Sequence, residues 1–211
     1  MHIRKFTFNP FQENTYVLHA DGKGILIDPG CSDRNEEREL ADWLKRNGIT
    51  PERVLLTHAH VDHVMGCAWV KAQYGLAPEL HRADLPVLEH AVASAALFGV
   101  LCAPPPAPAR FIEEGEVVTL GNEHLDVLFV PGHAPGHVAF FNPKKRFIIS
   151  GDVLFQRSIG RTDLPGGDLD TLVESIRSQL YPLGDQVVVY CGHGPETTIG
   201  EERRENPFVN G

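Results

Sequence analysis

The sequence predicts an α/β domain in which two β-sheets form a core that helices cover on the outside. Strand-like segments occur in two runs along the 211 residues, and helical segments follow each run. No linker and no internal repeat divides the chain, and its length is ordinary for one domain, so we expect a single domain over residues 1–211. A composition of 42% hydrophobic and 22% charged residues is typical of a globular protein with a large core.

The first run of strands occupies the N-terminal part of the chain. Strands are predicted at 2–8, 15–19 and 24–28, with turns at Asn9-Pro10 and Asp21-Gly22 between them. A helix at 36–47 follows, because Leu40, Trp43 and Leu44 share one face and Gly48 ends it. Further along, the patterns predict a buried strand at 54–57, a helix that begins just beyond residue 63 and runs to 73, a strand at 79–81 and a helix at 83–98.

The second run consists of two hairpins and ends in helices. Strands at 116–120 and 124–130 flank a Gly-Asn-Glu turn, and strands at 138–142 and 146–150 form the next pair. Residues 168–180 predict an amphipathic helix with Asp168 as its N-cap. Its apolar stripe consists of Leu169, Leu172, Val173, Ile176 and Leu180. A buried strand at 186–191 and a short charged helix at 200–206 complete the predicted elements.

Charge and composition exclude several kinds of partner. A formal net charge of -9 at pH 7 argues against nucleic acid or an anionic membrane surface as the main partner. The N-terminal residues contain no apolar signal region. The most apolar stretch, 91–103, is too short to span a bilayer and is interpreted as a buried or interface helix.

The four cysteines form no CxxC pair, so we expect reduced thiols in a cytoplasmic protein. We expect this protein to be a monomer or a small homo-oligomer.

The most informative motif is His58-Ala59-His60-Val61-Asp62-His63. Four metal-ligating side chains stand in these six positions, directly after the apolar run Val54-Leu55-Leu56. His133, Asp152 and His193 each follow another apolar, strand-like run, which is where α/β folds place their chemistry. Five imidazoles and two carboxylates are enough for two metal ions, with positions left for water. Two close metals that share a hydroxide make hydrolysis the leading hypothesis.

The spacing divides the motif between two metal ions. His58 and His60 alternate, so in an extended loop they point the same way, and His133 would complete their site. Asp62 and His63 come where the chain bends into a helix, and they can reach a second ion.

The remaining two residues complete this arrangement. His193 would complete the second site, and Asp152 can bridge both ions because a carboxylate has two oxygens. We therefore predict two divalent metal ions, with Asp62 and Asp152 as the catalytic carboxylates among the ligands. Zinc is the first expectation, and iron and manganese are the alternatives, because histidine and carboxylate ligands suit all three.

This pattern resembles the metallo-β-lactamase superfamily. The HxHxDH motif at 58–63, followed in order by His133, Asp152 and His193, carries a resemblance that extends from the Asp-Pro-Gly turn at 28–30 to residue 194. It implies an αββα sandwich of two mixed β-sheets flanked by helices, α+β by its strand arrangement, with the metals at one edge of the sheets. It also implies that Asp28 supports the ligand loop from behind, although turn formation would explain that residue too. For His137 we expect a supporting or buried structural role rather than direct ligation.

Within the superfamily the chain resembles the short glyoxalase II-like hydrolases. The segment Gly151-Asp152-Val153-Leu154-Phe155 matches the GDxLF step of glyoxalase II, and residues 158–168 resemble the short subgroup that lacks a C-terminal helical domain. The resemblance implies hydrolysis of a small thioester, first of all S-D-lactoylglutathione. Arg161 aligns with a basic residue that family members use to contact glutathione, and an ion pair with Asp163 or Asp168 is the structural alternative. Full-length glyoxalase II holds glutathione with its helical domain, whereas only a short tail follows His193 here.

Three other functions stay open at this point. A persulfide dioxygenase of the same fold would use one iron, held by residues matching His58, His133 and Asp152, and segment 160–163 resembles that branch. A lactonase or phosphodiesterase-type hydrolase would use the two-metal site, although the acidic balance disfavours a nuclease. A non-catalytic metal-binding descendant is disfavoured because the ligand set is complete.

Overall fold

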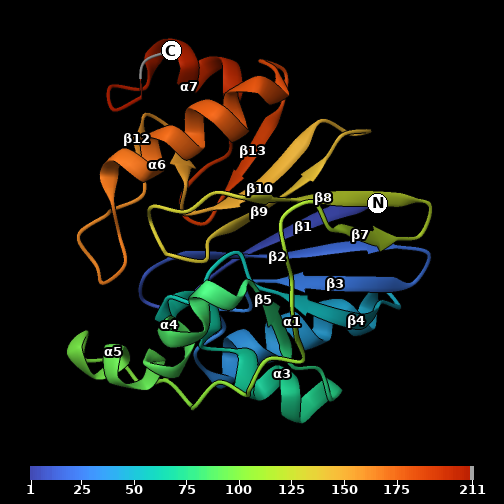
Figure 1. Ribbon diagram of the computed structural model, residues 1–211. Helices are drawn as coiled ribbons and strands as arrows, with labels where there is room; N and C mark the ends of the chain where they lie inside the picture. Colours follow the sequence, from blue (N-terminus) through green and yellow to red (C-terminus); the bar gives the residue numbers. More distant parts are fainter. Residues whose placement is uncertain (210–211) are drawn as a thin grey trace.

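Two six-stranded β-sheets lie face to face, and helices cover both outer faces (Figure 1). The structure is a computed structural model that describes residues 1–209. The strand order is β1-β2-β3-β4-β5-β6 in the first sheet and β14-β13-β10-β9-β8-β7 in the second. Strands β3 to β6 are parallel to one another, as are β10 and β13, and the other neighbours are antiparallel. The predicted sandwich of two mixed sheets is therefore confirmed.

The strands agree closely with the two predicted runs. The first sheet contains β1 (His2–Phe8), β2 (Glu13–Ala20), β3 (Lys23–Ile27), β4 (Thr50–Leu55), β5 (Pro78–Leu80) and β6 (Arg110–Phe111). The second sheet contains β7 (Val117–Leu120), β8 (Glu123–Phe129), β9 (Val138–Asn142), β10 (Phe147–Gly151), β13 (Val188–Cys191) and β14 (Thr197–Thr198). A separate pair consists of β11 (Leu154–Phe155) and β12 (Ser158–Ile159). The sequence patterns missed β6, β11, β12 and β14, because two residues are too few to show a period.

Alternation along the strands builds three apolar layers. Tyr16 and Leu18 of β2 point into the core between the sheets, where they join Val127 and Phe140 of the second sheet. Val17, between them in the sequence, points to the outer face. Successive side chains of a strand point to opposite faces, so a sheet covered on both sides is apolar at every position. Each large side chain that is fully buried in this way contributes about 1.5–3 kcal/mol to stability.

Helices on the two outer faces complete the sandwich. The helices of the structure are α1 (Arg34–Arg46), α2 (Val61–Val64), α3 (Cys67–Tyr74), α4 (Leu85–Glu89), α5 (Ala91–Leu97), α6 (Leu169–Ser175) and α7 (Ile199–Glu205). Leu40 and Leu44 of α1 and Val70 of α3 pack on the first sheet. Leu172 of α6 and Ile199 of α7 pack on the second. Within residues 1–209 no helix is long and apolar enough to cross a membrane.

Three predicted helices differ from the observed ones. The helix expected after residue 63 begins at Val61 instead and is divided into α2 and α3, so Asp62 and His63, two potential ligands of the HxHxDH motif, lie inside a helix. The helix expected at 168–180 consists of α6 (Leu169–Ser175) followed by a π-helical turn at Ile176–Leu180 (η2). Leu169 at its start is 52% exposed, so it does not belong to the buried apolar stripe. Asp168 is the N-cap as predicted, since its side chain accepts a hydrogen bond from Thr171 N.

The helix predicted at 83–98 is divided into three pieces. A 3₁₀ turn, η1 (Arg82–Asp84), precedes α4, and α5 follows after His90. Pro86 stands in the first turn of α4, where the missing N–H of proline costs no hydrogen bond. Asp84 lies at the end of η1, directly before α4.

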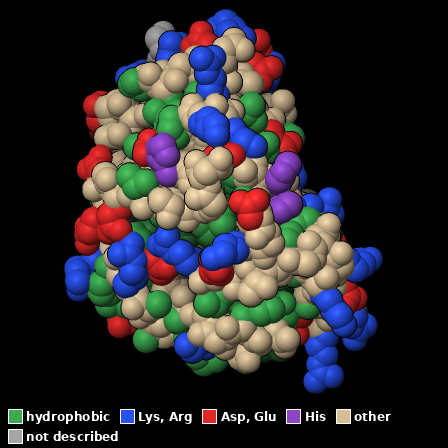
Figure 2. Space-filling model, turned by 90° about the vertical axis from the view of Figure 1, so that its right-hand side faces the viewer, with side chains coloured by type: hydrophobic (Ala, Val, Ile, Leu, Met, Phe, Trp, Pro, Cys, Tyr) green, Lys and Arg blue, Asp and Glu red, His purple; other side chains and the backbone are tan. Residues whose placement is uncertain are grey.

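The face on the right-hand side of Figure 1 carries mixed charge. Figure 2 shows Lys and Arg side chains interspersed with Asp and Glu over this face. It displays no continuous basic stripe of the kind that follows a nucleic-acid backbone.

The two sheets are joined by hydrogen bonds at one edge. Val138 N of the second sheet donates to Thr57 O, which follows β4, at 2.8 Å. Asn14 N of β2 donates to Gly192 O, which follows β13, at 2.7 Å. The loops that follow β4, β8, β10 and β13 meet at this edge, and these loops carry the residues singled out in the sequence.

Candidate metal centre

Five histidines and two aspartates converge at the joined edge of the sheets. His58 and His60 lie in the loop after β4, and Asp62 and His63 lie in α2. The other three follow strands of the second sheet, namely His133 after β8, Asp152 after β10 and His193 after β13. The structure thus brings together all seven residues that the sequence predicts as metal ligands.

Within residues 1–209, three groups of three residues are compact enough to hold a metal ion, and two of them match the predicted ligand sets. The first triad is His58, His60 and His133, and the second triad is Asp62, His63 and His193. Within each group the potential ligand atoms all lie within 4.8 Å of one another. In the first triad, His133 Nε2 is 2.8 Å from His60 Nδ1 and 3.2 Å from His58 Nε2. These are the two groups that the spacing of the motif predicts.

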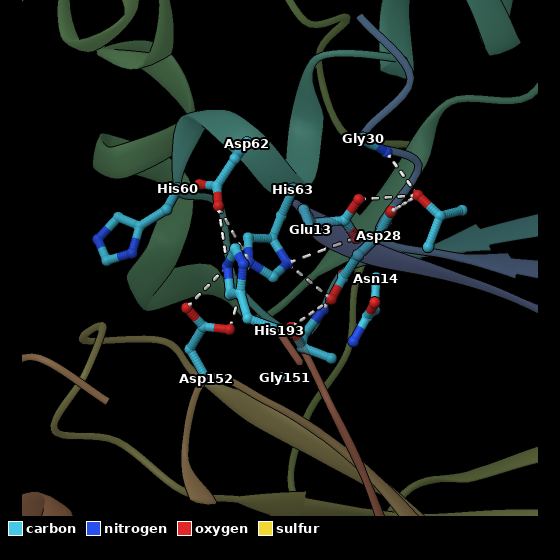
Figure 3. Close-up of polar contacts among 12 residues, drawn as sticks. Glu13, Asn14, Asp28, Gly30, His60, Asp62, His63, Gly151, Asp152 and His193 are labelled. Carbon is cyan, nitrogen blue, oxygen red and sulfur yellow. Dashed lines mark hydrogen bonds and ion pairs between the residues drawn. The ribbon is translucent and has the colours of Figure 1, made fainter. Parts of the chain in front are cut away.

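Asp152 lies between the triads. Its Oδ2 is 3.5 Å from His133 Nε2 of the first triad and 3.5 Å from His193 Nε2 of the second. Its Oδ1 is 3.4 Å from His63 Nε2, and Figure 3 shows the carboxylate facing the His193 ring. Within the described chain, His63 Nε2 and Asp152 Oδ1 are buried and have no hydrogen-bond partner. A cation between them would satisfy both atoms, so the residues fit a metal centre.

Asp28 supports the second triad from behind. It accepts hydrogen bonds from Thr57 N at 2.7 Å and Thr57 Oγ1 at 2.6 Å, and its Oδ2 is 3.1 Å from His63 Nδ1. This nitrogen is on the opposite side of the ring from Nε2, which faces Asp62 and Asp152 (Figure 3). Asp28, His58 and His63 also form a compact group, but Asp28 contacts the His63 nitrogen that points away from the centre. We therefore interpret Asp28 as orienting His63, in agreement with the sequence expectation.

His137 supports Asp152 rather than joining either triad. Its Nε2 accepts a hydrogen bond of 3.1 Å from Asp152 N. Its ring stacks on that of His58, with centroids 4.6 Å apart and an interplanar angle of 14°. The acceptor role requires the proton of the neutral ring to be on Nδ1. The supporting role expected from the sequence agrees with this geometry.

The triads differ in their electrostatics. Burial, together with the neighbouring imidazoles, lowers the pKa of His58 well below its usual value, and the pKa of His60 falls to about 3 for the same reasons. Burial also lowers the pKa of His193, but Asp152 and Asp62 raise it more, to about 10. The same two carboxylates outweigh burial at His63, whose pKa lies well above the ordinary value. The first triad is therefore an all-imidazole group with free lone pairs, and the second combines imidazoles with carboxylate charge.

Several positioning residues carried no signal in the sequence. The side-chain amide of Asn14 donates to Cys191 O at 3.1 Å and to Gly194 O at 2.9 Å, and Tyr16 Oη donates to Cys191 O at 2.6 Å. These bonds hold the turn that contains His193. Asn14 and Tyr16 stand in an ordinary strand pattern 177 and 175 residues away, so only the fold could reveal their roles.

Arg161 contacts the centre through its backbone. Its carbonyl oxygen is 2.7 Å from His133 Nδ1, so it orients that ring. Its guanidinium forms a bidentate pair with Asp163, with Nε–Oδ1 and Nη2–Oδ2 distances of 2.7 and 2.8 Å. Both side chains are more than half exposed, so the pair is weak and can open toward a ligand.

Comparison with known proteins identifies the family. Residues 8–193 match the Metallo-beta-lactamase superfamily. The "Hydroxyacylglutathione hydrolase GloC" of Haemophilus influenzae is 38% identical, over 100% of this chain and 99% of that protein. The "Probable metallo-hydrolase YqgX" of Bacillus subtilis is also 38% identical, over 100% of this chain and 99% of that protein.

Two solved structures agree over the whole chain. The di-iron-bound form of TTHA1623 has a TM-score of 0.89 and 41% identity, covering 98% of this chain and 100% of that one. The BLEG-1 B3 metallo-beta-lactamase has a TM-score of 0.89 and 38% identity, with 100% of both chains covered. The fold, the two triads and these relatives together show that the chain belongs to the metallo-beta-lactamase superfamily and is a metal-dependent hydrolase.

Proposed function

We propose that the protein is a binuclear metal-dependent thioesterase that hydrolyses S-D-lactoylglutathione to D-lactate and glutathione. The observation that carries the proposal is the position of Asp152 between two triads, each compact enough for one ion. Two divalent ions bound there would lower the pKa of a shared water and polarise the thioester carbonyl.

The chain's own residues hold the site in shape and handle the proton. Asp152 aligns the triads, and its backbone N–H is fixed by His137. The Asp62 side chain is 14% exposed, and its Oδ2 is 3.1 Å from His193 Nε2. Of the two carboxylates, Asp62 has the more exposed side chain, 14% against 11% for Asp152, so it is our candidate to take the proton of an attacking water. We therefore assign Asp62 and Asp152 as the two catalytic carboxylates among the seven ligands.

A relative of the same length supports the choice of a thioester substrate. The protein that bears the name hydroxyacylglutathione hydrolase is 99% covered by this chain, so its length matches the chain described here. Arg161 is the candidate contact for a glutathione carboxylate, because its weak pair with Asp163 can exchange one carboxylate for another. The chemistry of the ligands does not select the metal, and zinc remains our first choice over iron and manganese.

The test is thiol release from S-D-lactoylglutathione by protein loaded separately with zinc, iron and manganese. Turnover that a chelator removes and that added metal restores would support the proposal and would rank the metals. No turnover with any of the three metals would overturn the choice of substrate.

The same preparations distinguish the other members of the fold. Oxygen consumption with glutathione persulfide would indicate a dioxygenase. A dioxygenase with one iron would not use the second triad, Asp62, His63 and His193, as a metal site. A simple lactone tests the lactonase alternative. A penicillin belongs in the panel because a neighbour at 38% identity is named a metallo-beta-lactamase.

A further inference from the structure

Asp84 is a fully buried carboxylate at the end of the turn η1. Its Oδ2 accepts a hydrogen bond of 2.6 Å from Ala59 N, and its Oδ1 accepts one of 2.6 Å from Gly136 N. Within the described chain it forms no ion pair with a lysine, arginine or histidine, although a carboxylate this deep normally needs a cation. Its two oxygens are thus committed to two backbone amides.

The two amides belong to the two loops of the first triad. Ala59 stands between His58 and His60, in the loop after β4 of the first sheet. Gly136 follows His133 by three residues, in the loop between β8 and β9 of the second sheet. One carboxylate therefore connects all three members of the first triad through the backbone that carries them.

The approach of Gly136 to Asp84 is unusually close. A Cβ atom at Gly136 would lie 2.4 Å from Asp84 N and 2.9 Å from Asp84 Oδ1. Only glycine therefore permits this hydrogen bond at its observed length. Both bonds are charge-assisted and lie in a dry interior, which makes them stronger than neutral hydrogen bonds.

We propose that Asp84 is a positioning residue for the metal ion of the first triad, holding His58 and His60 at the correct distance from His133. The inference rests on the two-metal site of the proposed function. Asp28 does the corresponding work for His63, so each triad has its own buried carboxylate behind it. The loops remain joined without Asp84, because Val138 N still donates to Thr57 O at 2.8 Å. Loss of Asp84 therefore loosens the first triad without separating the sheets.

Metal binding, rather than turnover, tests this role. We expect the unsubstituted protein to bind two Co²⁺ ions in a calorimetric titration. Asp84→Ala should bind one ion as before and the other at least about tenfold more weakly, the usual effect of removing such a support. Asp84→Asn should fall between the two, because its single oxygen satisfies only one amide. The visible spectrum of bound Co²⁺ should change for the weakened ion alone.

Ligand variants identify which ion is affected. In a His193→Ala background only the first triad is complete, and Asp84→Ala should weaken the remaining ion. In a His60→Ala background the second triad is complete, and Asp84→Ala should leave its ion unchanged. Equal weakening in the two backgrounds, or no weakening in either, would overturn the proposal.

A matched control separates positioning from general loss of stability. Glu202 is also a buried carboxylate that accepts a backbone hydrogen bond, from Arg157 N at 2.7 Å, but it lies on α7. Glu202→Gln should lower the thermal midpoint and leave both Co²⁺ affinities unchanged. If Asp84→Ala does not fold, Asp84→Asn carries the test. The proposed function fails separately if the protein binds two ions but releases no thiol from S-D-lactoylglutathione, since the Asp84 result is read from affinity.

Discussion

His137 Nε2 accepts a hydrogen bond of 3.1 Å from the backbone N–H of Asp152, so a histidine outside both triads fixes the carboxylate between them. The bond spans two turns that follow β8 and β10, and both residues are buried. Asp152 must reach both triads, so its backbone has to be fixed, because a shift toward one triad would move the carboxylate away from the other. The ligand set is therefore only part of the centre, and its supports are equally specific.

His137→Leu should lower kcat about 10–100-fold, because it leaves the Asp152 N–H without an acceptor and frees the carboxylate. KM should stay unchanged, since His137 acts on Asp152 and not on the substrate. His137→Gln should recover part of the loss through its amide oxygen. Steady-state kinetics with S-D-lactoylglutathione checks this, with the exposed His90→Gln as control. A raised KM at constant kcat would contradict the assignment.

Asp62→Ala should reduce turnover by about a thousandfold or more, because a metal centre supplies several kcal/mol of transition-state stabilisation. Asp152→Asn should act as strongly despite its unchanged size, because it loses the charge shared by the triads. Metal analysis of each purified variant should show fewer than two ions per chain. The control is Asp126→Asn, a partly exposed aspartate of β8 paired with His124. Full turnover by Asp62→Ala would rule out the proposed mechanism.

Arg161 and Asp163 should affect substrate binding in opposite directions. Arg161→Ala removes the candidate partner of a glutathione carboxylate, so kcat/KM for S-D-lactoylglutathione should fall about tenfold. Asp163→Ala frees the guanidinium and should lower KM. Neither change should affect a thioester without carboxylates, because the Arg161 backbone bond to His133 remains. Equal effects on both substrates would show that Arg161 acts on the centre instead.

Ionised Glu79 of β5 should stabilise the first sheet, and this contribution should be complete at pH values above 4.5, the ordinary pKa of a glutamate. Burial raises the pKa of Glu79, but hydrogen bonds from Arg53 and Arg110 lower it more, so the folded pKa lies below 4.5. The stabilisation is therefore complete above pH 4.5 and is lost as the pH falls through the lower folded value.

Glu79→Gln should lower the free energy of unfolding at pH 7 by about 1–2 kcal/mol. The difference from the unsubstituted protein should shrink in acid, as followed by urea unfolding at several pH values. Glu52→Gln is the matched control, because its pair with Lys23 is exposed on both sides and should contribute little. A difference that stays constant down to acid pH would show that the charge of Glu79 is not responsible.

The sequence was enough to predict the two-sheet fold. It also predicted the six residues of the two triads, and Asp152 as the seventh. Alternation and short apolar runs are local, so the strands at 2–8 and 138–142 were predicted with the observed bounds. The HxHxDH motif is local as well, and its spacing already separates His58 and His60 from Asp62 and His63.

Tertiary structure alone decided how these residues are held. Asp84 meets Gly136 across 52 residues, and Asn14 meets Cys191 across 177. Neither contact leaves a periodic pattern, because a hydrogen bond between distant segments depends on the path of the whole chain. For the same reason the break in the predicted helix at 83–98, which places Asp84 on a turn, could not be foreseen. Residue chemistry and local period therefore determined the fold and the candidate ligands, and long-range packing decided which buried groups fix their geometry.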